Sequence, residues 1–240
     1  MIIFLGDSFT WGQGLQLSYW IDNGKSIEEC NKLMPPDVPS ETYDYYTDEF
    51  RRKHHFPNLV SKHFNKSYVT KYGNGGTNND IVEILDSLPN QMDCGGIDFF
   101  VIQLTESSRD LPEHYASNKE LNLPLTEQIK EIDKWLEEYK EDKIKQIIGK
   151  IRLISNAPFF ITTWREDFNH ILEKKFKEYL IPLQYNENTY ISFEELGEEN
   201  KHLHLNHQFE DSHNLHLNID AHKIIASSII NKVENSKKLI

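Results

Sequence analysis

The sequence has little cysteine, no long apolar run and few basic residues. Cys30 and Cys94 are its two cysteines and show no Cys-x-x-Cys spacing, which argues against a disulfide-stapled scaffold and indicates reduced thiols. No apolar run reaches the roughly 18 residues that a membrane-spanning helix needs. Asp and Glu outnumber Lys and Arg by 38 to 26, and the net charge of −12 argues against nucleic acid or an anionic membrane as a main partner.

The amino terminus also lacks the features of a secretory signal. Met1 leads directly into a short apolar segment, with no basic stretch before it and no long apolar stretch after it. Together with the few cysteines, this predicts a cytoplasmic protein.

The composition is that of a folded protein. Hydrophobic residues make up 38% of the 240 positions and aromatic residues 12%, enough for one large core. We find no internal repeat and no convincing linker, so we predict a single domain over residues 1–240. Residues 17–50 are polar, rich in Pro and Tyr and without a sustained period, which predicts an insertion or lid at about 17–50.

Predicted strands alternate with predicted helices along the chain. Short apolar runs predict strands at 2–5, 67–73, 97–104, 157–164 and 189–193. Helical spacing of apolar residues predicts helices at 50–65, 78–88, 124–150, 168–180 and 219–233. This alternation favours an α/β fold, with a mainly parallel five-stranded sheet covered by helices on both faces.

A serine stands where the first predicted strand ends, in Gly6-Asp7-Ser8. In a parallel sheet, functional sites lie beyond the carboxyl ends of the strands, so segments 73–78 and 103–109 should meet Ser8 there. A serine nucleophile needs a base, a group that orients the base and donors for the oxyanion. The segment "EDSHNLHLNIDAH" offers the carboxylate of Asp211 and three histidines as bases, namely His213, His216 and His222.

These segments resemble the SGNH (GDSL) hydrolases, serine esterases with a three-layer α/β/α, flavodoxin-like fold. "GDS" resembles the first block of the family, which implies that Ser8 is the nucleophile and that its backbone N–H is one oxyanion donor. "NGGTNNDI" resembles the second block, whose glycine N–H is a second donor. The resemblance assigns that role to Gly75, with Gly76 as the near alternative.

The last block selects one of the three histidines. "HLNIDAH" is similar to His-Pro-Asn-x-x-Gly-His, which implies that His216 is the base. The spacing from His216 to His222 matches, whereas Leu217 and Ala221 replace the usual Pro and Gly. The combination of all three blocks in order is more specific than "GDS" alone.

The sequence departs from the family in two places. The third block normally supplies an asparagine as an oxyanion donor, but here Gln103-Leu104-Thr105-Glu106 follows the strand, which leaves the hydroxyl of Thr105, or else Arg109, as donor. The triad acid normally stands three residues before the histidine, where this chain has His213. Asp211 stands five residues before it and can orient His216 if the turn is wider; a Ser–His dyad that uses a backbone carbonyl is the alternative.

Other roles for the same residues have to be weighed. Ser8 could simply cap a helix, Asp7 is more typical of a structural turn residue, and the glycines could form a plain turn. The histidines near the carboxyl terminus could suggest a metal, but a zinc-helix spacing such as His-Glu-x-x-His is missing. We therefore predict no metal and no cofactor.

The predicted activity is that of a serine esterase. The resemblance implies a small acyl group, for example acetyl, on a carbohydrate or another alcohol. Two further hypotheses stay open: a catalytically silent SGNH-fold module for binding or assembly, and a hydrolase of phosphoesters or thioesters. Aromatic residues before and within the insertion could stack on a sugar or close as a lid: Trp11, Trp20, Tyr43, Tyr45 and Tyr46.

Overall fold

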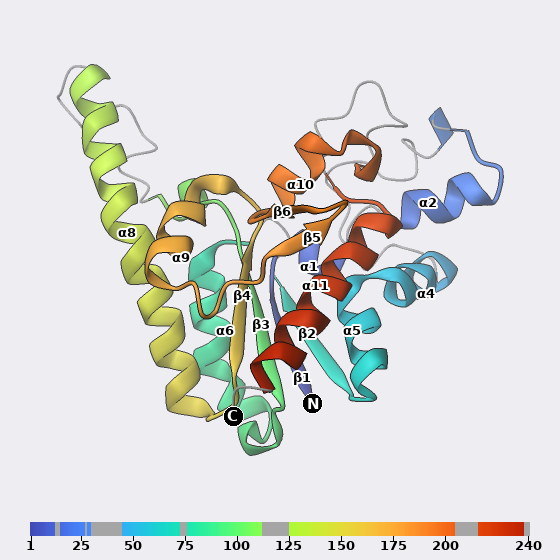
Figure 1. Cartoon of the computed structure of the whole chain (residues 1–240), viewed down its shortest axis with the longest axis horizontal. Coiled ribbons are helices and arrows are strands. Elements are labelled where there is room, and N and C mark those ends of the chain that lie inside the picture. Colours follow the sequence, from blue (N-terminus) through green and yellow to red (C-terminus); the bar gives the residue numbers. More distant parts are fainter. Residues whose placement is uncertain are drawn as a thin grey trace.

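Figure 1 shows the chain as a computed structural model. The structure describes residues 1–12, 15–26, 28–29, 45–72, 76–111, 125–204 and 216–237. Within these ranges, its description leaves out the side chains of Ser8, Trp11, Gln16, Leu17, Ile21, Asp22, Tyr45, Tyr46, Thr47, Tyr72, Leu125 and Lys237.

A four-stranded parallel sheet forms the centre of the molecule, in the order β2-β1-β3-β4. Its strands are β1 (Ile2–Gly6), β2 (Tyr68–Tyr72), β3 (Phe99–Leu104) and β4 (Phe159–Thr163). Every residue of β1, β3 and β4 is buried, which explains why these strands have mainly apolar sequences. Ile3 pairs with Val69 on one side and with Phe100 on the other.

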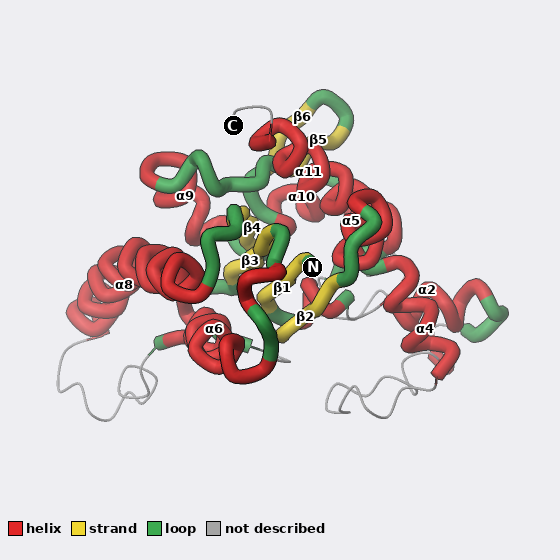
Figure 2. The backbone as a smooth tube through the Cα atoms, turned by 90° about the horizontal axis from the view of Figure 1, so that it is seen from below, coloured by secondary structure: helices red, strands yellow, loops and turns green. Residues whose placement is uncertain are grey.

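Helices cover both faces of the sheet (Figure 2). On one face, α5 (Phe56–Phe64) and α11 (Ile219–Lys237) pack on alternate strand residues that include Phe4 and Val101. On the other face, α6 (Asn78–Gln91), α8 (Leu125–Ile154) and α9 (Asn169–Lys175) pack on the intervening residues, which include Leu5. The three-layer α/β/α prediction is therefore confirmed.

Shorter elements connect these layers. The helices among them are α1 (Ser8–Trp11), α2 (Leu15–Asp22), α4 (Tyr45–His54) and α10 (Phe193–Glu199). The 3-10 turns are η2 (Cys94–Gly96), η3 (Ser107–Asp110), η4 (Glu166–Phe168) and η5 (Lys201–Leu203). A separate antiparallel hairpin joins β5 (Leu183–Tyr185) to β6 (Asn188–Tyr190).

The prediction of a fifth strand in the main sheet is wrong. Its residues 189–193 contribute to β6, and only isolated bridges, Ile161 with Leu180 and Thr163 with Ser192, lie beside β4. The hairpin turns at two residues with positive φ, and the Ser192 side chain then caps α10 by accepting a hydrogen bond from the N–H of Glu195. Because the segment turns and enters a helix so soon, it cannot extend along β4.

The predicted helix at 50–65 is two helices, α4 and α5, which meet at His55. Pro57 has no N–H, so it cannot continue the hydrogen bonds of α4, but it fits the first turn of α5. The side chain of Asn58 donates to the carbonyl of Lys53, 2.9 Å away, and satisfies the end of α4.

The predicted insertion at 17–50 overlaps α2 at its start and α4 at its end, while residues 30–44 lie outside the described residues. Among the helices that the structure describes, none combines the length and the apolar character needed to cross a membrane.

Candidate functional site

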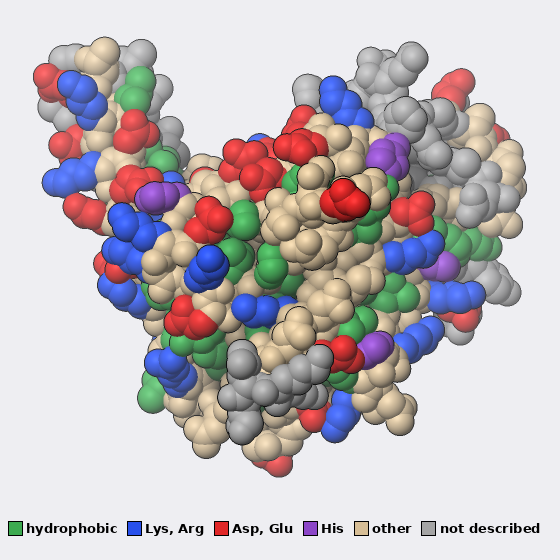
Figure 3. All heavy atoms as spheres, in the orientation of Figure 1, with side chains coloured by type: hydrophobic (Ala, Val, Ile, Leu, Met, Phe, Trp, Pro, Cys, Tyr) green, Lys and Arg blue, Asp and Glu red, His purple; other side chains and the backbone are tan. Residues whose placement is uncertain are grey.

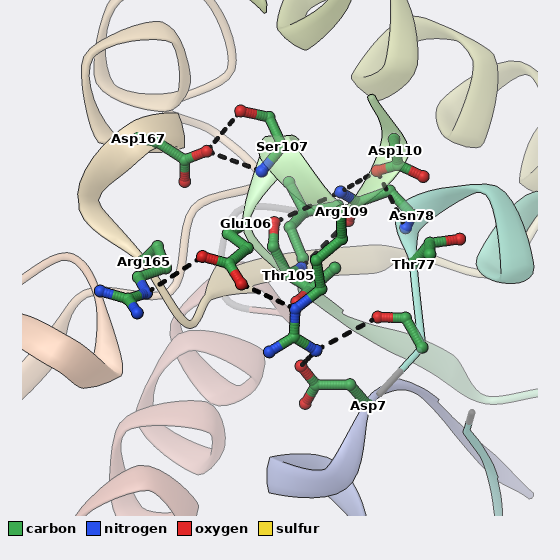
Figure 4. Close-up of polar contacts among 12 residues, drawn as sticks. Asp7, Thr77, Asn78, Thr105, Glu106, Ser107, Arg109, Asp110, Arg165 and Asp167 are labelled. Atoms are coloured by element: carbon green, nitrogen blue, oxygen red, sulfur yellow. Dashed lines mark hydrogen bonds and ion pairs between the residues drawn. The ribbon is translucent and has the colours of Figure 1, made fainter. Parts of the chain in front are cut away.

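The site predicted from the sequence lies at the carboxyl ends of the strands, where loops from all four strands converge (Figure 4). Asp7 follows β1, Thr77 and Asn78 follow β2, and Thr105 follows β3. The backbone of Ser8 begins α1 directly after β1; its side chain lies outside the description.

The turn after β1 is locked to β3. The backbone N–H and the hydroxyl of Thr10 both donate to Oε1 of Gln103, at 3.1 and 2.8 Å. A Cβ on Gly6 would lie 2.2 Å from Oγ1 of Thr10, so only glycine permits this approach. The position of Ser8 at the start of α1 is therefore fixed by hydrogen bonds that Ser8 itself does not make.

Asp7 has a structural role in the same turn. Its side chain is 1% exposed, and Oδ1 accepts the N–H of Phe9 at 2.9 Å. Burial raises the pKa of the Asp7 carboxyl, against the hydrogen bonds from Phe9 and Gln103, the charge of Arg109 and the contact with the Thr105 side chain. Oδ2 lies 3.6 Å from Nη1 of Arg109. Asp7 thus orders the loop that carries Ser8.

The segment after β2 begins a helix. Thr77 caps α6 in a capping box with Asp80, in which each side chain accepts a hydrogen bond from the backbone N–H of the other residue. Gly75, the predicted second oxyanion donor, lies outside the described residues, whereas Gly76 is described and buried.

Asn78 holds the loops after β2 and β3 together. Its Oδ1 accepts the N–H of Thr105 at 3.0 Å, and its Nδ2 donates to the carbonyl of Thr105 at 3.3 Å and to Oδ2 of Asp110 at 2.8 Å. Asp110 also accepts the backbone N–H groups of Asn78 and Asn79, at 3.2 and 2.9 Å. The sequence reasoning missed this pair, although Asn78 belongs to the block that it compared with the family.

These contacts fix the main chain of Thr105 and leave its hydroxyl available. Thr105 is 1% exposed, and its Oγ1 makes no hydrogen bond of ordinary geometry within the described part of the chain, although the Thr105 side chain faces the Asp7 carboxyl closely enough to lower its pKa. An unpaired buried hydroxyl is costly unless another group uses it.

Arg109 and Glu106 start a row of alternating charges. Nε of Arg109 donates to Oε1 of Glu106 at 2.9 Å, and Oε2 of Glu106 lies 3.4 Å from Nε of Arg165. Arg165 in turn forms an ion pair with Glu194 on α10. The row crosses the edge of the sheet from β3 to β4, as Figure 4 shows for its first three members.

His216 is held against the turn that carries Ser8. An antiparallel bridge between Leu217 and His204 fixes the backbone next to it. The centroid of the His216 ring lies 4.5 Å from that of Phe9, and Phe9 stacks on Trp164 with ring centroids 3.6 Å apart. The residue after Ser8 is therefore in contact with the predicted base.

The His216 ring is buried and uncharged. Burial, with a smaller effect from the charge of Arg109, lowers the pKa of His216 to about 3, so the imidazole is neutral at pH 7. Its Nδ1 is buried and, among the described residues, has no hydrogen-bond partner. Asp211, predicted to orient this nitrogen, and His213 both lie outside the described residues.

The other histidine of the block has a structural contact. Nδ1 of His222 accepts the backbone N–H of Phe56 at 3.2 Å, and its ring stacks on that of Phe56. Two residues after His216, Asn218 accepts the N–H groups of Asp220 and Ala221 at 3.0 and 3.1 Å and starts α11. The block therefore positions the last helix as well as His216.

No group of three or more His, Cys, Asp or Glu side chains within the described ranges could hold a metal ion. Most of the histidine-rich segment, residues 205–215, falls in a gap between those ranges.

No protein-family model and no curated protein matches the sequence. Among solved structures, it is similar to an α/β hydrolase from the metagenome of Lake Arreo, Spain, with 10% identity, a TM-score of 0.50 and coverage of 97% of this chain and 94% of that one. An esterase from Pseudoalteromonas sp. matches at 13% identity and TM-score 0.47, over 99% of this chain and 98% of the other. An acetylxylan esterase from Geobacillus stearothermophilus matches at 15% identity and TM-score 0.46, over 97% of this chain and 93% of the other.

At such low identities, a structural match bears on the fold only. The match at TM-score 0.50 spans almost the whole chain and agrees with the α/β fold that the sequence predicted.

Proposed function

We propose that the protein hydrolyses carboxylic esters, with Ser8 as nucleophile and His216 as base. The observation that carries the proposal is the contact between His216 and Phe9, which brings a buried, neutral imidazole from the last loop against the residue that follows Ser8. This arrangement links two blocks that lie near opposite ends of the sequence.

The chemistry follows from the protonation state of His216. The neutral imidazole takes the proton of the Ser8 hydroxyl as it attacks the ester carbonyl, and later returns it to the leaving alcohol. With a pKa near 3 the ring is a weak base, so it needs a carboxylate at Nδ1 to stabilise the imidazolium. The unpartnered Nδ1 of His216 supports this need, and we propose Asp211 for the role.

The oxyanion is proposed to bind the backbone N–H groups of Ser8 and Gly75 and the hydroxyl of Thr105. The buried Oγ1 of Thr105 supports its part, because it makes no hydrogen bond of ordinary geometry among the described residues while Asn78 fixes the main chain of Thr105. A donor of this kind contributes roughly 3–4 kcal/mol to the stability of the transition state.

The proposed substrate is an ester of a small acyl group, such as acetyl, with a carbohydrate or another alcohol. It rests on the resemblance to the SGNH hydrolases. Residues 17–50 are proposed to act as a lid over this edge, within one domain.

Labelling with a fluorophosphonate probe tests the proposal. We expect the native protein to be labelled at Ser8, as located by peptide mass spectrometry, and the denatured protein to remain unlabelled. Ser8→Ala should abolish both labelling and hydrolysis of p-nitrophenyl acetate, with Ser87→Ala in α6 as the matched control.

Turnover by Ser8→Ala within tenfold of the parent would contradict Ser8 as nucleophile. A folded parent that is neither labelled nor active would favour the silent binding module, for which the missing asparagine of the third block is the supporting observation.

A further inference from the structure

Arg109 occupies the loop in which the resembled family keeps its oxyanion asparagine. It lies in η3, which is separated from the end of β3 by Thr105 and Glu106, and its Nη1 lies 3.6 Å from Oδ2 of Asp7 and 3.5 Å from the carbonyl oxygen of Gly76. The guanidinium group of Arg109, which belongs to the segment after β3, therefore contacts both the turn after β1 and the segment after β2. Figure 4 shows the side chain extending from η3 toward Asp7, with Glu106 beside it.

The contacts of Arg109 hold the group in place without using all its donors. Nε makes a hydrogen bond of normal length to Glu106, at 2.9 Å, while both contacts of Nη1 are long. Nη2 makes no hydrogen bond within the described part of the chain, and the side chain is 27% exposed. A guanidinium has five N–H donors in a rigid plane, so fixing Nε also fixes the direction of the others.

The charge of Arg109 also acts at the predicted base. Among the described residues, Arg109 is the charged group that adds to the effect of burial in lowering the pKa of His216. The guanidinium is therefore near the turn that carries Ser8, near the second block and near His216, which are the three segments that surround a tetrahedral intermediate.

We propose that Arg109 is a catalytic residue that donates a hydrogen bond from its guanidinium to the oxyanion, in place of the missing asparagine. The inference rests on the proposed function and adds a full positive charge to the two backbone donors and Thr105. When Ser8 attacks, the carbonyl oxygen gains a negative charge, and a fixed cation stabilises that charge more than it stabilises the neutral ester. No bond to Arg109 forms and no proton leaves it.

Arg165 supplies the matched control. It contacts the same carboxylate, Glu106, through its own Nε at 3.4 Å, but it also pairs with Glu194 on α10, away from Asp7. Removing Arg165 changes the charge around Glu106 by the same amount, while the contacts of Arg109 with Asp7 and Gly76 remain.

The experiment measures kcat and KM for p-nitrophenyl acetate in Arg109→Ala, Arg109→Lys and Arg165→Ala. We expect Arg109→Ala to lower kcat by about 100-fold or more with KM within about threefold, as for the loss of an oxyanion donor. Arg165→Ala should stay within about threefold of the parent in both constants. Methylguanidine, at concentrations far below those that unfold proteins, should restore part of the activity of Arg109→Ala and none of that lost in Ser8→Ala.

Three results would overturn the inference. The first is a kcat of Arg109→Ala within threefold of the parent, and the second is an equal loss of kcat in Arg165→Ala. The third is a higher KM of Arg109→Ala at unchanged kcat, which would indicate that Arg109 binds an anionic group of the substrate. Arg109→Lys, which keeps the charge but loses the planar donors, should retain more of the parent kcat than Arg109→Ala. If Arg109→Ala does not fold, Arg109→Gln decides, because glutamine keeps a polar side chain and removes the charge; a parent-like kcat would then contradict the role. Activity in Ser8→Ala would overturn the proposed function as well as the role of Arg109. An inactive Ser8→Ala together with an Arg109→Ala as active as the parent would overturn the role of Arg109 and leave the proposed function standing.

Discussion

The backbone N–H of Phe56 donates a hydrogen bond to Nδ1 of His222, although the two residues are 166 positions apart. The bond connects the first turn of α5 to α11, the two helices that cover the same face of the sheet. Because Nδ1 accepts, it must be unprotonated, so the fold requires a neutral His222. Burial, with smaller electrostatic effects of His216, Arg51 and His54, lowers the pKa of His222 to about 3.

This contact predicts a pH-dependent stability. An unfolded histidine binds a proton near pH 6.5, whereas folded His222 does so only near pH 3. The unfolding free energy should therefore be highest above pH 6.5 and fall as the pH decreases toward 3, by up to about 1.4 kcal/mol per pH unit for each such histidine. His216 adds a second term of the same sign.

His222→Asn isolates the contribution of one histidine, because Oδ1 of asparagine can replace Nδ1 as acceptor and does not titrate. Urea unfolding at pH 7.5 and pH 5 should show a smaller pH effect in this variant than in the parent. The exposed His63, replaced by asparagine, is the control. A variant with the same pH effect as the parent would show that His222 is not held neutral.

The contacts of Asn78 predict that replacing it by alanine lowers both stability and activity. Asn78→Ala removes the acceptor of the Thr105 N–H and a donor of Asp110, and each buried group left unpaired costs about 1–3 kcal/mol. Asn79→Ala is the matched control, since Lys143 keeps Gln146 as a partner when the Asn79 side chain is removed. The melting temperature Tm and kcat should both fall in Asn78→Ala and stay close to the parent values in Asn79→Ala. A Tm of Asn78→Ala equal to that of the parent would contradict the role of Asn78.

Two glycines give opposite predictions for the same substitution. Gly6→Ala would place Cβ 2.2 Å from Oγ1 of Thr10 and break the lock between α1 and Gln103, so stability and ester hydrolysis should both decrease. Gly149→Ala, inside α8, meets no atom within 4 Å and should raise the unfolding free energy by roughly 0.5–1 kcal/mol. Urea unfolding of the two variants checks both signs, and a Gly6→Ala protein as stable as the parent would show that the turn can relax.

The strands could be predicted from the sequence because the residues of each strand by themselves indicate that it is buried. β3 and β4 are covered on both faces, so each is an apolar run that needs no partner to be recognised. The segment 189–193 also has a strand-like pattern of aromatic and β-branched residues. Its structure depends on the turn before it and on the cap at Ser192, neither of which a pattern of hydrophobicity shows.

The site was predictable only in part, for a related reason. The position of His216 followed from the spacing of one block, whereas the pairing of Asn78 with Asp110 joins residues 32 positions apart and has no local signature. The neutral state of His216 also depends on tertiary burial, since an isolated histidine has a pKa near 6.5.

The last prediction concerns the partner of His216. Its buried Nδ1 has no acceptor among the described residues, so the orienting group has to come from another segment, and Asp211 and His213 are the candidates. If Asp211 reaches Nδ1, His216→Ala should lower kcat by several orders of magnitude, because the base itself is lost. His213→Ala should cost roughly tenfold or less, and Asp211→Asn should fall between the two, since the base stays but loses its orientation. The three variants, compared on one ester, decide the order. A loss in His213→Ala as large as that in His216→Ala would place His213 in the catalytic machinery and remove Asp211 from it.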